Sequence, residues 1–86
     1  MAAMLLRRVD PVYPTIAKTA HISGVVHLHA IISKDGTIRE LEVVDGSPWL
    51  AQAALAAVRQ WRYRPTLLSG EPVEVDTNIT VLFTLY

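Results

Sequence analysis

Two histidines, His27 and His29, are the residues of this chain whose type and spacing could bind a metal ion. Side chains two positions apart in a β-strand point to the same face, so two imidazoles placed in this way can share one ion. His21 lies upstream as a third nitrogen ligand, and Glu40 and Glu42 could reach the pair if the following segment folds back beside it. Solvated histidines on the face of a sheet are the simpler interpretation. We therefore expect no metal and no other cofactor.

The sequence contains no recognisable arrangement of catalytic groups. No serine lies in a nucleophile elbow, no glycine-rich loop could hold a phosphate, and no cysteine is present to act as a nucleophile. Eight basic and eight acidic residues give a net charge of zero, which provides no long-range attraction for nucleic acid. The sequence thus predicts a binding protein that is not an enzyme and that has no nucleic-acid partner.

Length and composition predict one small folded domain. A chain of 86 residues with 51% apolar and 19% charged residues suits a single hydrophobic core. We interpret residues 1–8 as an N-terminal tail and residues 9–86 as the domain. The apolar run at residues 1–6 is too short to span a bilayer, and Arg7 and Arg8 follow it instead of preceding it, so it predicts neither an anchor nor a signal peptide.

Alternating apolar and polar residues predict a β-hairpin near the middle of the chain. Its strands cover residues 25–32 and 37–44, and Gly36 in the turn supplies the positive φ that tight hairpins need. The core side of the first strand consists of Val26, Leu28, Ala30 and Ile32.

Two helices are predicted, one on each side of this hairpin in the sequence. Pro14 at a first helical position indicates a short helix over residues 14–20. The main helix begins at about Pro48 and is stopped by Pro65. Its apolar stripe contains Leu50, Ala54, Ala57, Val58 and Trp61, and the arginines expected to offset its dipole at the C-terminal end are Arg59, Arg62 and Arg64.

The last segment, residues 73–85, has the clearest two-residue period and predicts a long strand. A strand of this length could run past the hairpin and leave part of its backbone unpaired. Together these elements predict a two-layer α+β fold, in which a three-stranded antiparallel sheet carries the main helix and the short N-terminal helix on one face.

Motifs spread along residues 9–86 resemble the TonB C-terminal domain family. They are Pro11-Val12-Tyr13-Pro14, Asp35-Gly36 at the hairpin turn and Trp61-Arg62-Tyr63-Arg64-Pro65 at the end of the main helix. Trp61 and Tyr63 could also be read as a ligand-stacking pair, but aromatic residues at the end of an apolar helical stripe are more often core anchors. We interpret as structural Tyr13, Pro14, Gly36, Trp61, Tyr63 and Pro65.

The resemblance implies a non-catalytic periplasmic module that binds the TonB box, a short extended segment of an outer-membrane receptor, by adding it as a strand to its own last strand. It also implies that regions upstream of this sequence anchor the protein in the inner membrane. There they would contact a proton-driven complex, whose force opens the receptor for siderophore or cobalamin uptake. The partner-binding positions that it implies are Asp10, Pro11, Val12 and Tyr13 with Val75, Thr77, Asn78, Ile79, Thr80, Val81, Leu82 and Phe83, in a strand expected to reach Leu85.

Two other functions use the same edge and stay open. A self-associating module would pair this strand with its copy to form a homodimer, for example by exchanging strands. An adaptor would keep the fold and bind a partner unrelated to transport, because a fold does not determine function.

Overall fold

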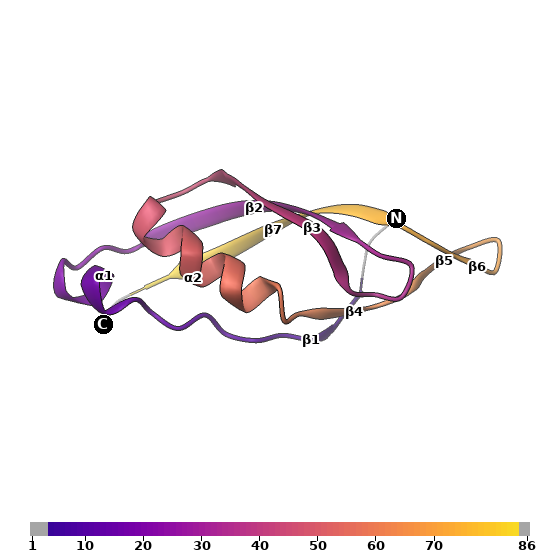
Figure 1. Ribbon diagram of the computed structural model, residues 1–86, viewed down its shortest axis with the longest axis horizontal. Coiled ribbons are helices and arrows are strands. Elements are labelled where there is room, and N and C mark those ends of the chain that lie inside the picture. The colour runs from indigo at the N-terminus through magenta and orange to yellow at the C-terminus, as the bar shows by residue number, and fades with distance from the viewer. Residues whose placement is uncertain (1–3, 85–86) are drawn as a thin grey trace.

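A three-stranded antiparallel sheet forms the centre of the computed structural model, which describes residues 4–84 (Figure 1). Its strands are β2 (Gly24–Ile32), β3 (Ile38–Asp45) and β7 (Val75–Phe83), in the spatial order β3-β2-β7. The helices α1 (Thr15–Thr19) and α2 (Pro48–Val58) form the second layer. The domain is elongated, with extents of 49 × 21 × 17 Å. This arrangement confirms the predicted two-layer α+β fold.

The core lies between the sheet and the helices because each strand has one apolar side. The predicted core residues of β2, from Val26 to Ile32, are all buried, and so is the predicted stripe of α2. In β7 the buried side chains are Val75, Ile79, Val81 and Phe83. Three residues in or next to this stripe are alanines: Ala51, Ala54 and Ala57. Because their side chains are short, α2 can lie close to the sheet.

Two small ribbons extend the structure beyond the central sheet. In the first, β1 (Met4–Arg7) pairs with β4 (Arg62–Arg64). In the second, β5 (Thr66–Leu68) pairs with β6 (Glu71–Val73) and forms a hairpin that projects at the right-hand end of Figure 1. The sequence pattern did not predict either ribbon.

The main helix ends at Val58, so the prediction that it continues to Pro65 is wrong. The amide groups of Gln60 and Trp61 donate to carbonyls three residues back, which closes a tight turn. After this turn Tyr63 is buried between the exposed residues Arg62 and Arg64, and this is the alternation of a strand. Arg62 and Arg64 therefore lie outside the helix, although the guanidinium of Arg62 still donates to the carbonyl of Arg59, the C-cap residue of α2.

The expected overrun of the last strand is also wrong, because β7 pairs along its whole length with β2. The nine residues of β7 face the nine of β2, from Gly24 opposite Phe83 to Ile32 opposite Val75. Among residues 4–84, no strand pairs with the second edge of β7. Leu85 lies outside the described residues.

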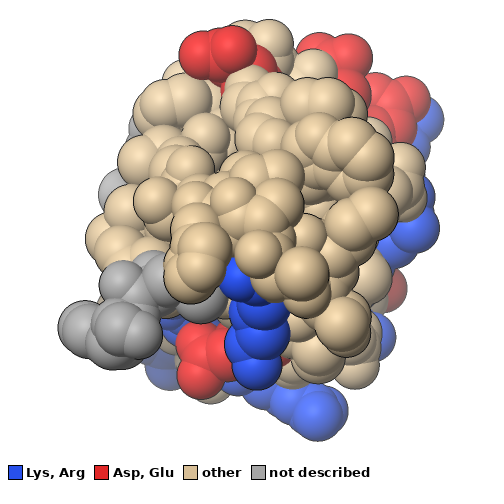
Figure 2. All heavy atoms as spheres, turned by 90° about the vertical axis from the view of Figure 1, so that its left-hand side faces the viewer, with Lys and Arg blue, Asp and Glu red and all other residues tan. Residues whose placement is uncertain are grey.

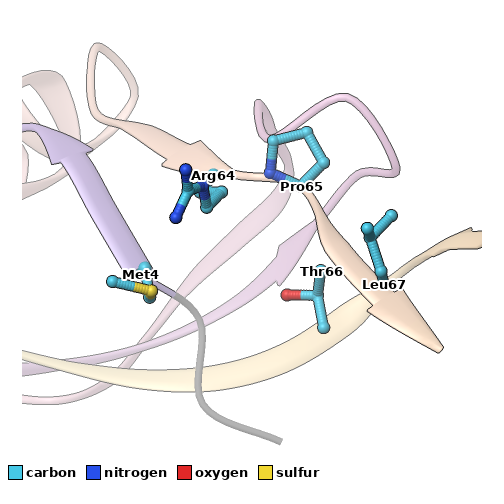
Figure 3. Close-up of a pocket in the computed structure, with 5 residues that line it drawn as sticks. All are labelled: Met4, Arg64, Pro65, Thr66 and Leu67. Atoms are coloured by element: carbon cyan, nitrogen blue, oxygen red, sulfur yellow. The ribbon is translucent and has the colours of Figure 1, made fainter. Parts of the chain in front are cut away.

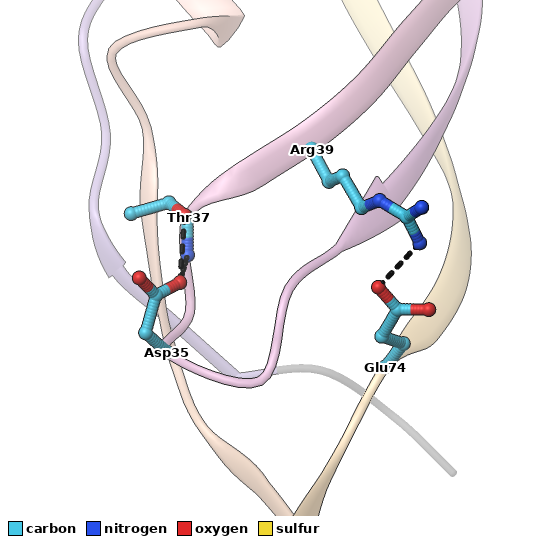
Figure 4. Close-up of polar contacts among 4 residues, drawn as sticks. All are labelled: Asp35, Thr37, Arg39 and Glu74. Atoms are coloured by element: carbon cyan, nitrogen blue, oxygen red, sulfur yellow. Dashed lines mark hydrogen bonds and ion pairs between the residues drawn. The ribbon is translucent and has the colours of Figure 1, made fainter.

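The hairpin turn between β2 and β3 packs against β4. Gly36 has φ +89°, and its carbonyl accepts a hydrogen bond of 2.8 Å from the amide of Tyr63. A Cβ at Gly36 would lie 1.9 Å from the carbonyl oxygen of Tyr63, so only glycine fits. On the other side of the turn, Arg39 and Glu74 form an ion pair of 2.6 Å that joins β3 to the start of β7 (Figure 4).

Candidate functional site

The free edge of β7 is regular along its whole length. Its pairing with β2 has no bulge, and within the described part of the chain no strand pairs with its other side. Side chains on its solvent face are exposed and mostly uncharged: Asp76, Asn78, Thr80 and Leu82. A straight edge of this kind presents a row of main-chain N–H and C=O groups that a second extended chain can pair with.

The edge of β3 has the opposite character. Its pairing with β2 shifts register twice, between His27 and Leu28 and between Ile31 and Ile32. It also carries the exposed charges of Arg39, Glu40, Glu42 and Asp45. Bulges and charges are features by which proteins prevent edge strands from pairing with other chains. Of the two edges of this sheet, β7 is therefore the one suited to strand addition.

The Tyr-Pro segment is held against the C-terminal end of β7. The ring of Tyr13 meets that of Phe83 edge to face, with centroids 5.5 Å apart. The hydroxyl of Tyr13 donates a hydrogen bond to the carbonyl of Ile22, in the loop that leads into β2. Pro14 then caps α1 in an extended conformation. The structure thus places Tyr13, the last of residues 10–13, against the end of β7.

Trp61 holds the other end of this segment. Its indole N–H donates a hydrogen bond of 2.8 Å to the carbonyl of Val9, and the guanidinium of Arg8 lies 5.6 Å from the centre of its ring. Trp61 is buried, so both contacts start from a fixed position in the core. Sequence reasoning did not find this link, because a main-chain carbonyl carries no residue-type signal.

Between the Trp61–Val9 hydrogen bond and the Tyr13–Phe83 contact, the chain exposes an apolar side chain. Val12 is 83% exposed although its neighbour Tyr13 is half-buried. Figure 2 shows this end of the molecule, on which uncharged atoms cover the middle and charged residues lie around the margin. Exposed apolar residues of the elements at this end also include Ile16 of α1 and Trp49 of α2. Val12, Ile16 and Trp49 thus give this end of the molecule exposed apolar side chains near the Tyr13–Phe83 contact.

The two histidines lie on the outer face of the sheet, where the sequence places them, but their surroundings do not converge on one point. The Nδ1 atom of His29 is 3.7 Å from Glu42, and its Nε2 atom is 3.7 Å from Asp76 on the other side of the ring. His27 instead lies 3.4 Å from the hydroxyl of Thr80. Among residues 4–84, no group of three or more His, Asp or Glu side chains could hold a metal ion.

Asp35 in the hairpin turn and Tyr63 in the core have shifted pKa values. The hydroxyl of Thr37, 2.7 Å away, and the Thr37 amide donate to Asp35 and lower the pKa of its carboxyl group (Figure 4). Burial raises the pKa of the Tyr63 phenol. The first shift belongs to the hairpin turn and the second to the core.

No helix within residues 4–84 has the length and apolar character needed to cross a membrane.

The chain is similar to a protein family and to two curated proteins that are all named for TonB. Residues 9–85 match the family described as Gram-negative bacterial TonB protein C-terminal. The chain is 32% identical over 85 residues to Protein TonB of Vibrio cholerae serotype O1, covering 96% of this chain and 35% of the relative. It is 33% identical over 82 residues to Protein TonB of Klebsiella pneumoniae, covering 93% of this chain and 32% of that relative. It thus spans about a third of their length.

A solved structure has the same fold. The solution NMR structure of the Pseudomonas aeruginosa TonB CTD superposes with a TM-score of 0.79 at 27% sequence identity, over 96% of this chain and 86% of that chain.

Proposed function

This chain belongs to the family of Gram-negative bacterial TonB protein C-terminal domains, and from this membership we propose that it is the receptor-docking domain of a TonB-like energy transducer. The membership confirms the resemblance inferred from the Tyr-Pro, Asp-Gly and WRYRP motifs. Because members of this family are not catalytic, it also confirms that the chain is not an enzyme.

The proposed partner is the TonB box of an outer-membrane receptor, bound as an added strand beside β7. The observation that carries this proposal is the unbroken free edge of β7, which ends beside Tyr13. Main-chain hydrogen bonds would supply most of the affinity, and the outward side chains of Asn78, Thr80 and Leu82 would contact alternate residues of the docked peptide. The outcome is a four-stranded sheet with the receptor segment at its edge.

Residues 10–13 would form the second part of the same interface. Contacts with Trp61 and Phe83 hold the segment at both ends, so little conformational freedom is lost when a partner covers it. Val12 offers an exposed apolar side chain next to the end of the docked strand. The segment would therefore extend recognition beyond the main chain of the receptor peptide.

The position of β7 also suits the transmission of force. A docked strand would be linked through β7 to β2, the central strand, by a ladder of nine residue pairs. Hydrogen bonds between antiparallel strands lie perpendicular to the strands. A force applied along the strand axis is therefore shared by many of these bonds at once. We place the domain in the periplasm, tied to the inner membrane and to its proton-driven complex by regions outside this sequence, and we assign it to the uptake of substrates such as siderophores.

Titration of the isotope-labelled domain with a synthetic TonB-box peptide tests this function. The amide signals of β7 and of residues 10–13 are expected to shift, while those of β3 stay in place. Val12→Ser should weaken binding about tenfold because it removes an apolar contact. The control is Val44→Ser, which changes an equally apolar exposed residue at the bulged edge strand β3 and should leave the affinity unchanged. Shifts on β3, or no shifts at all, would reject docking at β7.

Self-association is the second candidate, because the free edge of β7 carries only one charged side chain, Asp76, to prevent pairing with a copy. A concentration-dependent dimer in sedimentation experiments, with no response to the peptide, would favour it. A monomer that does not bind the peptide would favour an adaptor role.

A further inference from the structure

Three arginines lie on the β1–β4 ribbon and a fourth lies next to it, away from the edge of β7. Arg7 lies directly opposite Arg62 in the register of the ribbon, and Arg64 lies opposite Met4. Because Tyr63 is buried, Arg62 and Arg64 point to the other, solvent side. Arg8 follows next in the chain. Like charges directly opposite each other destabilise a strand pair, so this arrangement disfavours the ribbon on its own.

Few carboxylates offset this charge. Among residues 4–84 neither Arg7, Arg62 nor Arg64 forms an ion pair, and Arg8 pairs with the exposed Asp10 at 3.6 Å. The field of Arg62 also reaches Asp35. Other acidic residues lie on the outer face of the sheet: Glu40, Glu42, Asp45 and Asp76. A chain with no net charge thus has a cationic region at the β1–β4 ribbon.

Exposed apolar side chains lie beside these arginines. Met4 and Leu6 of β1 and Leu67 and Leu68 of the β5–β6 hairpin are each more than half exposed. Met4, Arg64, Pro65, Thr66 and Leu67 line an open groove of about 600 Å³ between the two ribbons (Figure 3). Its walls are mainly apolar, and the guanidinium of Arg64 lies at its margin. Apolar side chains next to a guanidinium suit the boundary between lipid headgroups and acyl chains.

We propose that the β1–β4 ribbon and the β5–β6 hairpin form a surface that binds bilayers containing anionic phospholipids. Arg7 and Arg64 would contact lipid phosphates, and Arg62, which donates to the carbonyls of Arg59 and Trp61, would add positive charge beside them. Met4, Leu6, Leu67 and Leu68 would enter the interfacial region. The hairpin carries one carboxylate, Glu71, which the four arginines outweigh. The surface is distinct from the edge of β7, so it goes beyond the proposed docking function and does not depend on it.

A bilayer fits these observations better than an acidic peptide. The exposed apolar residues come from two separate ribbons, so they do not follow one strand edge on which an extended peptide could align. A bilayer surface needs no register and accepts side chains from both ribbons at once. The β5–β6 hairpin and α1 lie towards opposite ends of the elongated domain (Figure 1), and β7 runs between them, so a receptor segment beside the Phe83 end of β7 would lie away from the ribbons.

Vesicle binding tests the proposal on the intact chain. We expect cosedimentation with vesicles of phosphatidylcholine and phosphatidylglycerol, much weaker binding to vesicles of phosphatidylcholine alone, and a decrease in binding as salt is raised. Arg7→Gln and Arg64→Gln should each weaken binding about fivefold. Leu67→Ser should weaken it about tenfold even at low salt, because it removes apolar area and no charge.

Matched controls come from the other end of the domain. Lys18→Gln removes an exposed cation of α1, and Val44→Ser removes an exposed apolar side chain, and both should leave vesicle binding unchanged. All the substituted side chains are exposed, and thermal unfolding of each variant checks that the fold is kept.

Two results would overturn the proposal. One is equal binding to both kinds of vesicle, or to neither. The other is binding of soluble polyglutamate as tightly as of anionic vesicles, which would assign the ribbon to an acidic polypeptide instead. The peptide titration of β7 is read independently, so each proposal can fail while the other stands.

Discussion

The rings of Tyr13 and Phe83 meet edge to face, with centroids 5.5 Å apart and planes at 86°. This contact joins a segment that precedes the sheet to the last buried residue of its last strand. Together with the hydrogen bond from Trp61 to Val9, it makes residues 9–13 and the edge of β7 parts of one surface.

Phe83→Leu is expected to weaken both stability and docking. It keeps an apolar side chain in the core but removes the aromatic pair, which contributes about 0.5–1.5 kcal/mol beyond burial. Urea unfolding measures the first effect and a TonB-box peptide titration the second. Tyr13→Phe is the matched control, because it keeps the ring contact and removes only the hydroxyl bond to Ile22, at a cost of about 1 kcal/mol. If Phe83→Leu left the amide exchange of residues 10–13 unchanged, the contact would not position that segment.

Trp61→Phe should release the other end of the segment while the fold persists. The phenyl ring cannot donate to the carbonyl of Val9, and losing this hydrogen bond costs about 1 kcal/mol. Hydrogen exchange is expected to accelerate in residues 9–13 more than in the central sheet. Trp61→Ala should instead cost about 3–5 kcal/mol, because it empties a core position. Uniform acceleration over all strands in Trp61→Phe would show a purely global effect.

Gly36→Ala is expected to destabilise the domain more than the same change at Gly70. Both glycines have positive φ, +89° and +81°, so each alanine variant loses about 1–2 kcal/mol from backbone conformation. Only at Gly36 does the added Cβ meet an atom, the carbonyl oxygen of Tyr63 at 1.9 Å, whereas nothing lies within 4 Å of a Cβ at Gly70. The difference between their unfolding free energies therefore measures the packing of the hairpin turn on β4. Equal losses would mean that this turn adjusts freely.

Acid should remove a stabilising contribution from Asp35. The bonds from Thr37 lower the pKa of this carboxyl group in the folded protein below its ordinary value of about 3.9. Its contribution is therefore complete above the unfolded-state pKa and is lost as pH falls through the folded-state pKa. Thermal unfolding from neutral pH down to about pH 2 should show Asp35→Asn less stable than the unchanged chain near neutrality, with the gap closing in acid. A gap independent of pH would rule this linkage out.

The local elements of the central sheet could be predicted because their signals are local. Two-residue alternation predicted β2 and β7, the turn at Gly36 predicted the hairpin, and Pro48 predicted the start of α2. The end of α2 was misjudged for a physical reason. Trp61 and Tyr63 are two apart, a spacing that suits a strand, but Trp61 also continues the helical stripe of Val58, so the two patterns overlap.

The candidate site was predicted in part. The family resemblance implied residues 10–13 and the last strand, and the fold brings them together at Tyr13 and Phe83. The contact of Trp61 with Val9 joins residues 52 positions apart through a main-chain carbonyl, so no side-chain pattern could indicate it.

By itself, the sequence determined which residues are buried in the strands and helices and which family the motifs resemble, because periodicity and capping act over a few residues. Only the tertiary structure decided that β7 lies beside β2 with an unbroken free edge, that β3 has a bulged and charged one, and that Arg7 faces Arg62. These relationships depend on register and on pairing between distant segments. Burial of the whole core sets that register, and no local stretch of residues encodes it.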